Sequence, residues 1–175
     1  MFTDPVKNLR ALGLREDHIV ADLGAGTGFY SVAAGHLVPK GKVYAVEVVR
    51  EFLATITGKA KDAHLHNVQT IWGNIEKRGG TKLKDNLVDA VVASNVLSQV
   101  EDKDKFIEEI KRILKPKGRV LFVDWSSDSK AVDFKIAQMF LAKGKAHEMF
   151  MKKGFILERE INAGDHHYGM ILVKS

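Results

Sequence analysis

The sequence contains no cysteine among its 175 residues. This absence excludes a disulfide framework, a cysteine-ligated zinc or iron–sulfur site, and a thiol nucleophile. It also fits a protein that works in a reducing compartment. Only three prolines are present, which argues against a proline-rich linker.

Long hydrophobic runs are also missing. The longest stretch without Asp, Glu, Lys or Arg is Leu23–Pro39, and its glycines and small residues exclude a membrane-spanning helix. The first ten residues, MFTDPVKNLR, lack the apolar segment of a signal peptide. We therefore expect a cytoplasmic protein with no membrane partner.

Charge and composition indicate an ordinary globular domain. Lys and Arg number 27 against 22 for Asp and Glu, a net charge of +5. This excess is too small to indicate nucleic acid as a partner, and no basic patch interleaved with aromatics accompanies it. With 45% hydrophobic and 28% charged residues, residues 1–175 are expected to form one domain. Nothing in the composition indicates an oligomeric state.

Apolar strand-like runs alternate with amphipathic helical runs along the chain. The expected strands are His18–Leu23, Lys42–Val48, Val68–Trp72, Leu87–Ser94, Arg119–Trp125, Phe155–Ile161 and Tyr168–Val173. The expected helices are Asp4–Leu12, Phe29–Leu37, Arg50–Lys61, one that begins after Asp102 and is stopped by Pro116 and Gly118, and Ser129–Lys153 with a break at Gly144.

This alternation predicts an open α/β sheet with parallel strands and helices on both faces. Only a short turn joins the last two expected strands. A parallel crossover needs about a dozen residues, so these two strands must run antiparallel. The prediction is therefore a mostly parallel sheet with a reversed last strand.

A glycine-rich turn follows the first expected strand, at Asp22–Gly28. Ligands of such sheets bind beyond the carboxyl ends of the strands, where glycine lets the backbone approach them closely. The dinucleotide fingerprint is not satisfied, because Phe29 stands where its third glycine is required. The phosphate-binding P-loop also fails, since no Gly-Lys-Ser/Thr follows.

The turn carries a more specific resemblance. Residues Asp22–Tyr30 (DLGAGTGFY) resemble motif I of the class I S-adenosylmethionine-dependent methyltransferases. Glu47, at the end of the second strand, can accept hydrogen bonds from two ribose hydroxyls. Residues 72–75 (WGNI) resemble the adenine-binding corner of the family, with Asn74 where the family usually has Asp. Residues 88–95 and 114–119 resemble the family's fourth strand and its entry into the fifth strand.

The resemblance extends from about Leu14 to the end of the chain and is greatest to the ubiquinone and menaquinone biosynthesis branch. It implies a three-layer Rossmann-like fold, a seven-stranded sheet with an antiparallel last strand, S-adenosylmethionine as methyl donor, and no metal. The glycine turn would bind the methionine moiety, Glu47 and Val48 the ribose, and Asn74 and Ile75 the adenine. The implied cofactor-binding residues are Asp22, Gly24, Ala25, Gly26, Gly28, Tyr30, Glu47, Val48, Gly73, Asn74, Ile75 and Ser94.

Three residues are candidates for a role in catalysis. Asn95 is expected to border the reacting methyl group beside Ser94. Asp124 lies near the end of the fifth strand on the active edge of the sheet, although it can equally be a helix or turn cap. His166 lies in the last turn on the same edge and could take a proton near neutral pH, or belong to an exposed surface pair.

Two further segments have alternative interpretations. The apolar residues of 134–141 indicate either core packing or a wall for a hydrophobic acceptor. Residues 2–8 indicate either a lid over the cofactor or a frayed end.

Three functions remain open at this point. The first is methylation of a small molecule. The second is methylation of protein or RNA, against which Ser94–Leu97 stands where an N/D-P-P-Y/F motif would be. The third is binding of S-adenosylmethionine without catalysis. The sequence favours the first of these.

Overall fold

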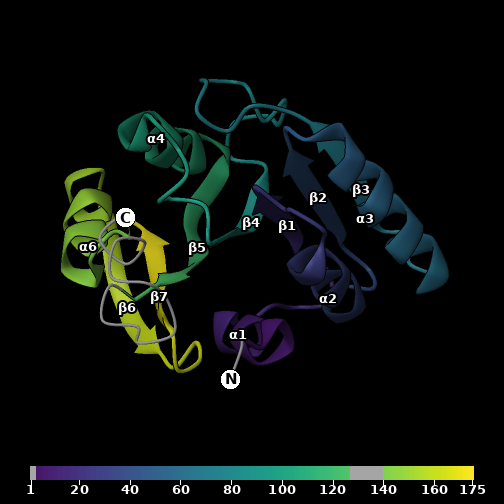
Figure 1. Cartoon of the computed structure of the whole chain (residues 1–175), viewed down its shortest axis with the longest axis horizontal. Coiled ribbons are helices and arrows are strands. Elements are labelled where there is room, and N and C mark those ends of the chain that lie inside the picture. Colours follow the sequence, from purple (N-terminus) through teal and green to yellow (C-terminus); the bar gives the residue numbers. More distant parts are fainter. Residues whose placement is uncertain (1–2, 127–139) are drawn as a thin grey trace.

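A computed structural model describes residues 3–126 and 140–175, which form a seven-stranded sheet with helices on both faces (Figure 1). The strands are β1 (Ile19–Leu23), β2 (Lys42–Glu47), β3 (Val68–Trp72), β4 (Val88–Ser94), β5 (Leu114–Trp125), β6 (Phe155–Ile161) and β7 (His167–Lys174). The helices are α1 (Pro5–Leu12), α2 (Phe29–Leu37), α3 (Arg50–Asp62), α4 (Lys103–Ile113) and α6 (Lys143–Lys152).

The strand order is β3-β2-β1-β4-β5-β7-β6. Neighbouring strands from β3 to β5 are parallel, whereas β7 runs antiparallel to both β5 and β6. The predicted Rossmann-like α/β fold with a reversed last strand is therefore confirmed. The chain crosses to the other side of β1 between β3 and β4, which opens a crevice at the carboxyl edge.

Local signals in the sequence explain several helix ends. Asp4 caps α1, where its carboxylate accepts a hydrogen bond from the Lys7 amide at 3.1 Å, and Pro5 takes the first helical position. Gly13 ends this helix in the left-handed conformation, with φ of 69°. Asp102 caps α4 in the same way through the Lys105 amide.

The junction between α4 and β5 differs from the prediction. The helix ends at Ile113, and β5 begins at once, because Leu114 pairs with Val88. The register then shifts, and regular pairing resumes between Ala90 and Arg119. Pro116 and Gly118 thus lie in an irregular part of the strand, where a missing amide or side chain is tolerated.

The helix expected over Ser129–Lys153 is also corrected. Residues 127–139 lie outside the described residues, and with them most of the apolar segment 134–141. Within the described part, α6 begins only at Lys143, and Gly144 lies in its first turn without breaking it. Residues 140–142 are not helical, since Phe140 stacks on Trp125 at 5.6 Å and the Leu141 carbonyl accepts from the Tyr168 hydroxyl.

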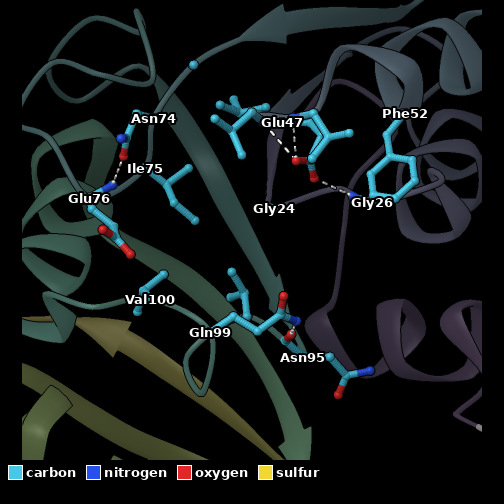
Figure 2. A pocket seen from close by; sticks show the side chains of 15 residues that line it. Gly24, Gly26, Glu47, Phe52, Asn74, Ile75, Glu76, Asn95, Gln99 and Val100 are labelled. Carbon is cyan, nitrogen blue, oxygen red and sulfur yellow. Dashed lines mark hydrogen bonds between the residues drawn. The ribbon is translucent and has the colours of Figure 1, made fainter.

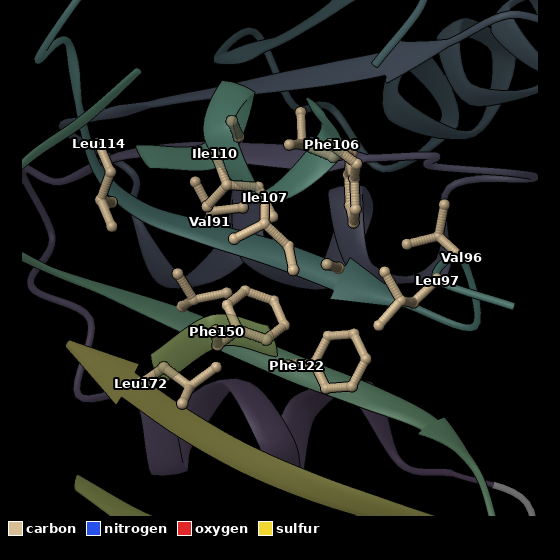
Figure 3. Close-up of a cluster of buried hydrophobic side chains, with 14 of the residues drawn as sticks. Val91, Val96, Leu97, Phe106, Ile107, Ile110, Leu114, Phe122, Phe150 and Leu172 are labelled. Carbon is tan, nitrogen blue, oxygen red and sulfur yellow. The ribbon is translucent and has the colours of Figure 1, made fainter. Parts of the chain in front are cut away.

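Two apolar cores fix the sheet between its helices. On one face α4 and α6 cover β4, β5 and β7, and Figure 3 shows Phe150 beside Phe122, with Phe106 and Ile110 of α4 in the same cluster. The Phe122 and Phe150 rings lie 5.2 Å apart. On the other face α1 and α2 cover the sheet through residues such as Leu9. Both cores leave the carboxyl edge of β1 to β4 free for a site.

The described residues 73–87, which connect β3 to β4, form no helix. The buried Glu109 of α4 holds this connection, because its carboxylate accepts hydrogen bonds from the Gly79 amide and from both the amide and hydroxyl of Thr81. Arg112 makes a 2.7 Å ion pair with the same carboxylate. The loop that borders the crevice is thereby anchored to the core. Within the described ranges, no helix is both long enough and apolar enough to cross a membrane.

Candidate active site

Two adjoining cavities open at the carboxyl edge of the sheet. The first, which we call the Glu47 cavity, has a volume of about 400 Å³. Its lining is Gly24, Gly26, Val46, Glu47, Val48, Val49, Phe52, Gly73, Asn74, Ile75, Glu76, Asn95, Val96, Gln99 and Val100. The second, the Tyr30 cavity, has a volume of about 600 Å³. Its lining is Thr3, Pro5, Asp22, Gly24, Ala25, Gly26, Thr27, Phe29, Tyr30, Ser94, Asn95 and Gln99.

The glycine turn after β1 lies between the two cavities, since Gly24 and Gly26 line both. Both residues have positive φ, 70° and 53°. A Cβ on Gly24 would lie 2.7 Å from a methyl of Val96, so the turn is pressed against the segment after β4. A Cβ on Gly26 would meet no described atom within 4 Å. The turn therefore exposes bare backbone to a space that a ligand can fill.

Gly28 has a different role from its neighbours. It precedes α2 with φ of 84°, and a Cβ there would lie 2.7 Å from the Ile56 side chain of α3. Glycine at this position lets α2 and α3 pack closely. Gly28 is not among the described residues that line the two cavities.

Glu47 joins the glycine turn to the residues that follow β2, as the dashed lines of Figure 2 show. Its Oε2 accepts a hydrogen bond from the Gly26 amide at 2.9 Å, and its Oε1 accepts from the amides of Val48 and Val49 at 2.7 and 3.0 Å. The side chain is almost fully buried. A carboxylate offers about four lone-pair positions, so it can still accept from a ligand hydroxyl.

The opposite wall of this cavity comes from the segment after β3. In Figure 2, Asn74, Ile75 and Val100 face Glu47 and Phe52 across the pocket. The Asn74 side-chain oxygen accepts from the Glu76 amide at 2.9 Å, which fixes a tight turn. Apolar side chains on both walls suit a flat aromatic group.

Asp22 and Tyr30 define the chemistry of the second cavity. Burial raises the pKa of Asp22 to about 6, although a 2.6 Å hydrogen bond from the Ser31 hydroxyl opposes this shift. The Tyr30 hydroxyl lies 2.9 Å from Asn8 Nδ2 and 3.2 Å from Thr3 Oγ1. These contacts attach the residues before α1 to the cavity rim. Within the segment 2–8, the described residues Thr3 and Asn8 are held at the cavity by these hydrogen bonds.

Asn95 lies where the two cavities meet. Its φ of 55° is unusual for a residue other than glycine, and its carbonyl accepts from Gln99 Nε2 at 2.6 Å. Its side-chain Oδ1 is buried and makes no hydrogen bond in the structure as described. A buried acceptor without a donor is costly, which marks this atom as a candidate ligand contact.

Two of the predicted catalytic residues, Asp124 and His166, are not among the described residues that line either cavity. Asp124 is fully buried, its Oδ1 accepts from the Trp125 amide at 2.8 Å, and burial raises its pKa to about 6. The predicted interpretation as a turn cap agrees with this contact. His166 is half-buried in the last turn, and its carbonyl accepts from the Ser126 amide. Its neighbour His167 is buried, with its ring 4.2 Å from that of Trp125.

Apart from Gly28, Asp124 and His166, every predicted site residue lines one cavity or the other. Phe52 and Gln99 line the cavities although the sequence did not predict them, whereas Thr3 belongs to the segment 2–8 expected as a lid or a frayed end. Phe52 could have been found, because the first turn of a helix that follows β2 lies at the carboxyl edge. Gln99 lies in an irregular segment, for which the sequence carries no pattern.

These residues fit a nucleoside that carries a positive charge. Glu47 suits vicinal hydroxyls, the apolar walls suit a base, and Asp22 lies in the adjoining cavity where it can balance a cation. Together with the strand order, the site defines the class of the S-adenosylmethionine-dependent methyltransferases.

The comparisons with known proteins agree. A family model described as a methyltransferase domain matches residues 14–156, and the chain belongs to that family. The chain is 34% identical over 116 residues to the ubiquinone/menaquinone biosynthesis C-methyltransferase UbiE of Pasteurella multocida (strain Pm70), over 65% of this chain and 42% of that protein. It spans about half the length of the curated relatives it matches.

Solved structures share the fold over nearly the whole chain. A SAM dependent methyltransferase from Aquifex aeolicus has a TM-score of 0.90 and 27% identity, over 99% of this chain and 91% of that one. The [4+2]-cyclase SpnF has a TM-score of 0.84 at 15% identity, over 97% of this chain and 79% of that one, a likeness of fold only. The predicted family is confirmed, and S-adenosylmethionine is the methyl donor of its class.

Proposed function

We propose that this protein transfers the methyl group of S-adenosylmethionine to a small-molecule acceptor. The observation that carries the proposal is the junction of two cavities at Gly24, Gly26 and Asn95. The nucleoside would occupy the Glu47 cavity, and the acceptor would enter the Tyr30 cavity. A donor and an acceptor bound on opposite sides of one turn are held close together, as group transfer requires.

The assignment of residues follows from their chemistry. Glu47 would accept hydrogen bonds from the ribose hydroxyls, while Asn74 and Ile75 would border the adenine. The Asp22 carboxylate would balance the charged amino group, and the glycine turn, which has no Cβ at Gly24 and Gly26, would let the amino-acid end approach the backbone closely. When bound, S-adenosylmethionine supplies an electrophilic methyl group, so this chain's main task is to orient the acceptor.

Asn95 is the best placed of the three predicted catalytic residues. Its Oδ1 needs a hydrogen-bond donor, which a hydroxyl or amine of the acceptor would supply. Asp124 is fully buried against the Trp125 amide, so we assign it to positioning the end of β5. His166 remains a candidate proton acceptor from the last turn.

A small molecule is favoured over a protein or an RNA. The relatives at 32–34% identity carry names of biosynthetic C-methyltransferases, although the match covers only 42–57% of their length. The Tyr30 cavity, at about 600 Å³, lies in the usual size range of small-molecule sites. SpnF shares this fold but is named a cyclase, so the fold alone does not determine the reaction.

Calorimetry and product detection test the proposal together. S-adenosylmethionine should bind to the full chain at one site, and small aromatic acceptors, quinols among them, should release S-adenosylhomocysteine. Asn95→Ala should lower kcat more than it changes the affinity for S-adenosylmethionine. Failure to bind S-adenosylmethionine would overturn the proposal. Binding without turnover on small molecules, but with turnover on protein or RNA, would overturn the acceptor class.

A further inference from the structure

Trp72, the last residue of β3, is outside the linings of both cavities but contacts the turn that carries Glu47. Its indole Nε1 donates a hydrogen bond to the Val48 carbonyl at 2.9 Å. Nearly half of the tryptophan surface is exposed, at 47%. This large aromatic side chain is therefore held in one orientation although it is half exposed.

The contact acts on one particular peptide unit. The carbonyl of Val48 and the amide of Val49 belong to the same peptide, and in a trans peptide these two groups point in opposite directions. Because the indole holds the carbonyl on one side, the amide is aimed at the other side. There the Val49 amide donates to Glu47 Oε1 at 3.0 Å.

The chain of contacts continues to the glycine turn. The other carboxylate oxygen of Glu47 accepts from the Gly26 amide at 2.9 Å. Hydrogen bonds in series polarise one another, so a donor at one end strengthens the next bond. The indole, the Val48–Val49 peptide and the Glu47 carboxylate thus form one donor-to-acceptor series, and the Gly26 amide donates to the other oxygen of the same carboxylate.

The indole ring is itself held in place by two cations. The Arg50 guanidinium lies 4.1 Å from the ring centroid, and the Lys82 ammonium lies 5.2 Å from it. Such cation–π contacts stabilise an exposed ring by a modest amount each. Arg50 comes from α3 and Lys82 from the connection between β3 and β4, so the ring also joins the two walls of the Glu47 cavity.

We propose that Trp72 is a positioning residue for S-adenosylmethionine binding, which acts by fixing the orientation of the Glu47 carboxylate. This inference rests on the proposed function, in which Glu47 binds the ribose. Trp72 lines neither cavity, so it would not contact a ligand bound in them. Its effect on affinity therefore has to pass through Glu47.

Trp72→Phe tests this role, because it retains an aromatic face for both cations and removes the N–H donor. The dissociation constant for S-adenosylmethionine, measured by calorimetry, should rise about three- to tenfold, the range expected for one net hydrogen bond. Tyr44→Phe is the matched control, since it also removes one polar hydrogen from an aromatic of the same sheet, and should leave the affinity unchanged.

Trp72→Phe is then repeated in a Glu47→Ala background. This double variant distinguishes an effect of Trp72 that passes through the Glu47 carboxylate from a local structural effect of losing the indole. Without the carboxylate, Trp72→Phe should change the dissociation constant by less than about twofold. An equal fold-change in both backgrounds, or none in the native background, would overturn the inference while leaving the proposed function intact. If Glu47→Ala alone leaves the affinity unchanged, the ribose assignment fails and the role of Trp72 fails with it.

Discussion

The Glu47 carboxylate accepts a hydrogen bond from the Gly26 amide across 2.9 Å, and this contact joins the ends of β2 and β1. The carboxylate and the glycine turn therefore fix one another before any ligand arrives. Preorganisation of this kind lowers the ordering cost of binding. Both partners were expected at the site from the sequence, but their direct contact was not.

Replacement of Glu47 should weaken cofactor binding. Glu47→Ala removes a charged acceptor, so we expect the binding free energy of S-adenosylmethionine to weaken by about 1–3 kcal/mol. The dissociation constant should then rise roughly 5- to 150-fold. Calorimetry measures the change directly. Glu51→Ala, an exposed acidic residue in the first turn of α3, is the control and should bind normally.

Substitution at Gly26 should remove binding through both shape and backbone strain. The positive φ disfavours any L side chain, and a valine would project into the space that both cavities share. Gly26→Val should abolish measurable binding, with unfolding at a temperature only a few degrees lower. Gly144→Ala, in the first turn of α6, should change neither property. Native affinity in Gly26→Val would remove the turn from the site.

Binding should depend on pH through Asp22. With its pKa raised to about 6 by burial, Asp22 is neutral below that pH and charged above it. A cationic ligand favours the charged form, so affinity for S-adenosylmethionine should fall as the pH drops from 7 to 5. Asp22→Asn should bind more weakly at pH 7 and with little pH dependence in this range. A pH profile that is the same in both proteins would contradict the assignment.

The contribution of Asp22 to folding stability should change with pH in the opposite direction to its contribution to binding. The raised pKa means that the folded state binds the proton more tightly than the unfolded state between pH 4 and 6. The contribution of Asp22 to the free energy of unfolding therefore decreases as the pH rises through this range. Thermal unfolding of the native protein and of Asp22→Asn should differ least below pH 4.

Glu109 should be important for stability and not for chemistry. Hydrogen bonds from Arg112 and Thr81 outweigh the cost of burial and lower the pKa of Glu109 to about 2. Glu109→Ala would remove the acceptor of the buried Thr81 amide and hydroxyl and one of the two carboxylate partners of Arg112, which keeps Asp85. This should cost about 3 kcal/mol, or roughly 6–12 °C in unfolding temperature. Glu108→Ala, which removes an exposed pair with Lys153, should have a small effect. Equal effects would contradict the anchoring role.

Much of the fold could be predicted because its signals are local. The spans of α2, β3 and β6 are as predicted, since periodicity and turn residues agree there. The start of β5 was missed because the pairing of Leu114 with Val88 overrides the helix-stop signals at Pro116 and Gly118. The start of α6 was missed because contacts of Phe140 and Leu141 with distant residues decide the backbone.

Those site residues that lie at the ends of strands could be predicted from the sequence. The carboxyl ends of parallel strands meet at one edge, which brings Asp22, Glu47, Asn74 and Asn95 together. Side-chain direction was not predictable in the same way. Trp72 follows the strand pattern, yet only the three-dimensional structure reveals that its indole N–H holds the Val48 carbonyl.

The position of β7 between β5 and β6 has a consequence for synthesis on the ribosome. The chain makes β6 before it makes the strand that will connect β6 to the sheet. Until β7 emerges from the exit tunnel, the β5 edge stays unpaired and β6 has no strand partner, although α6 can already pack on it. Attachment of β6 to the sheet therefore depends on β7, which pairs with both strands.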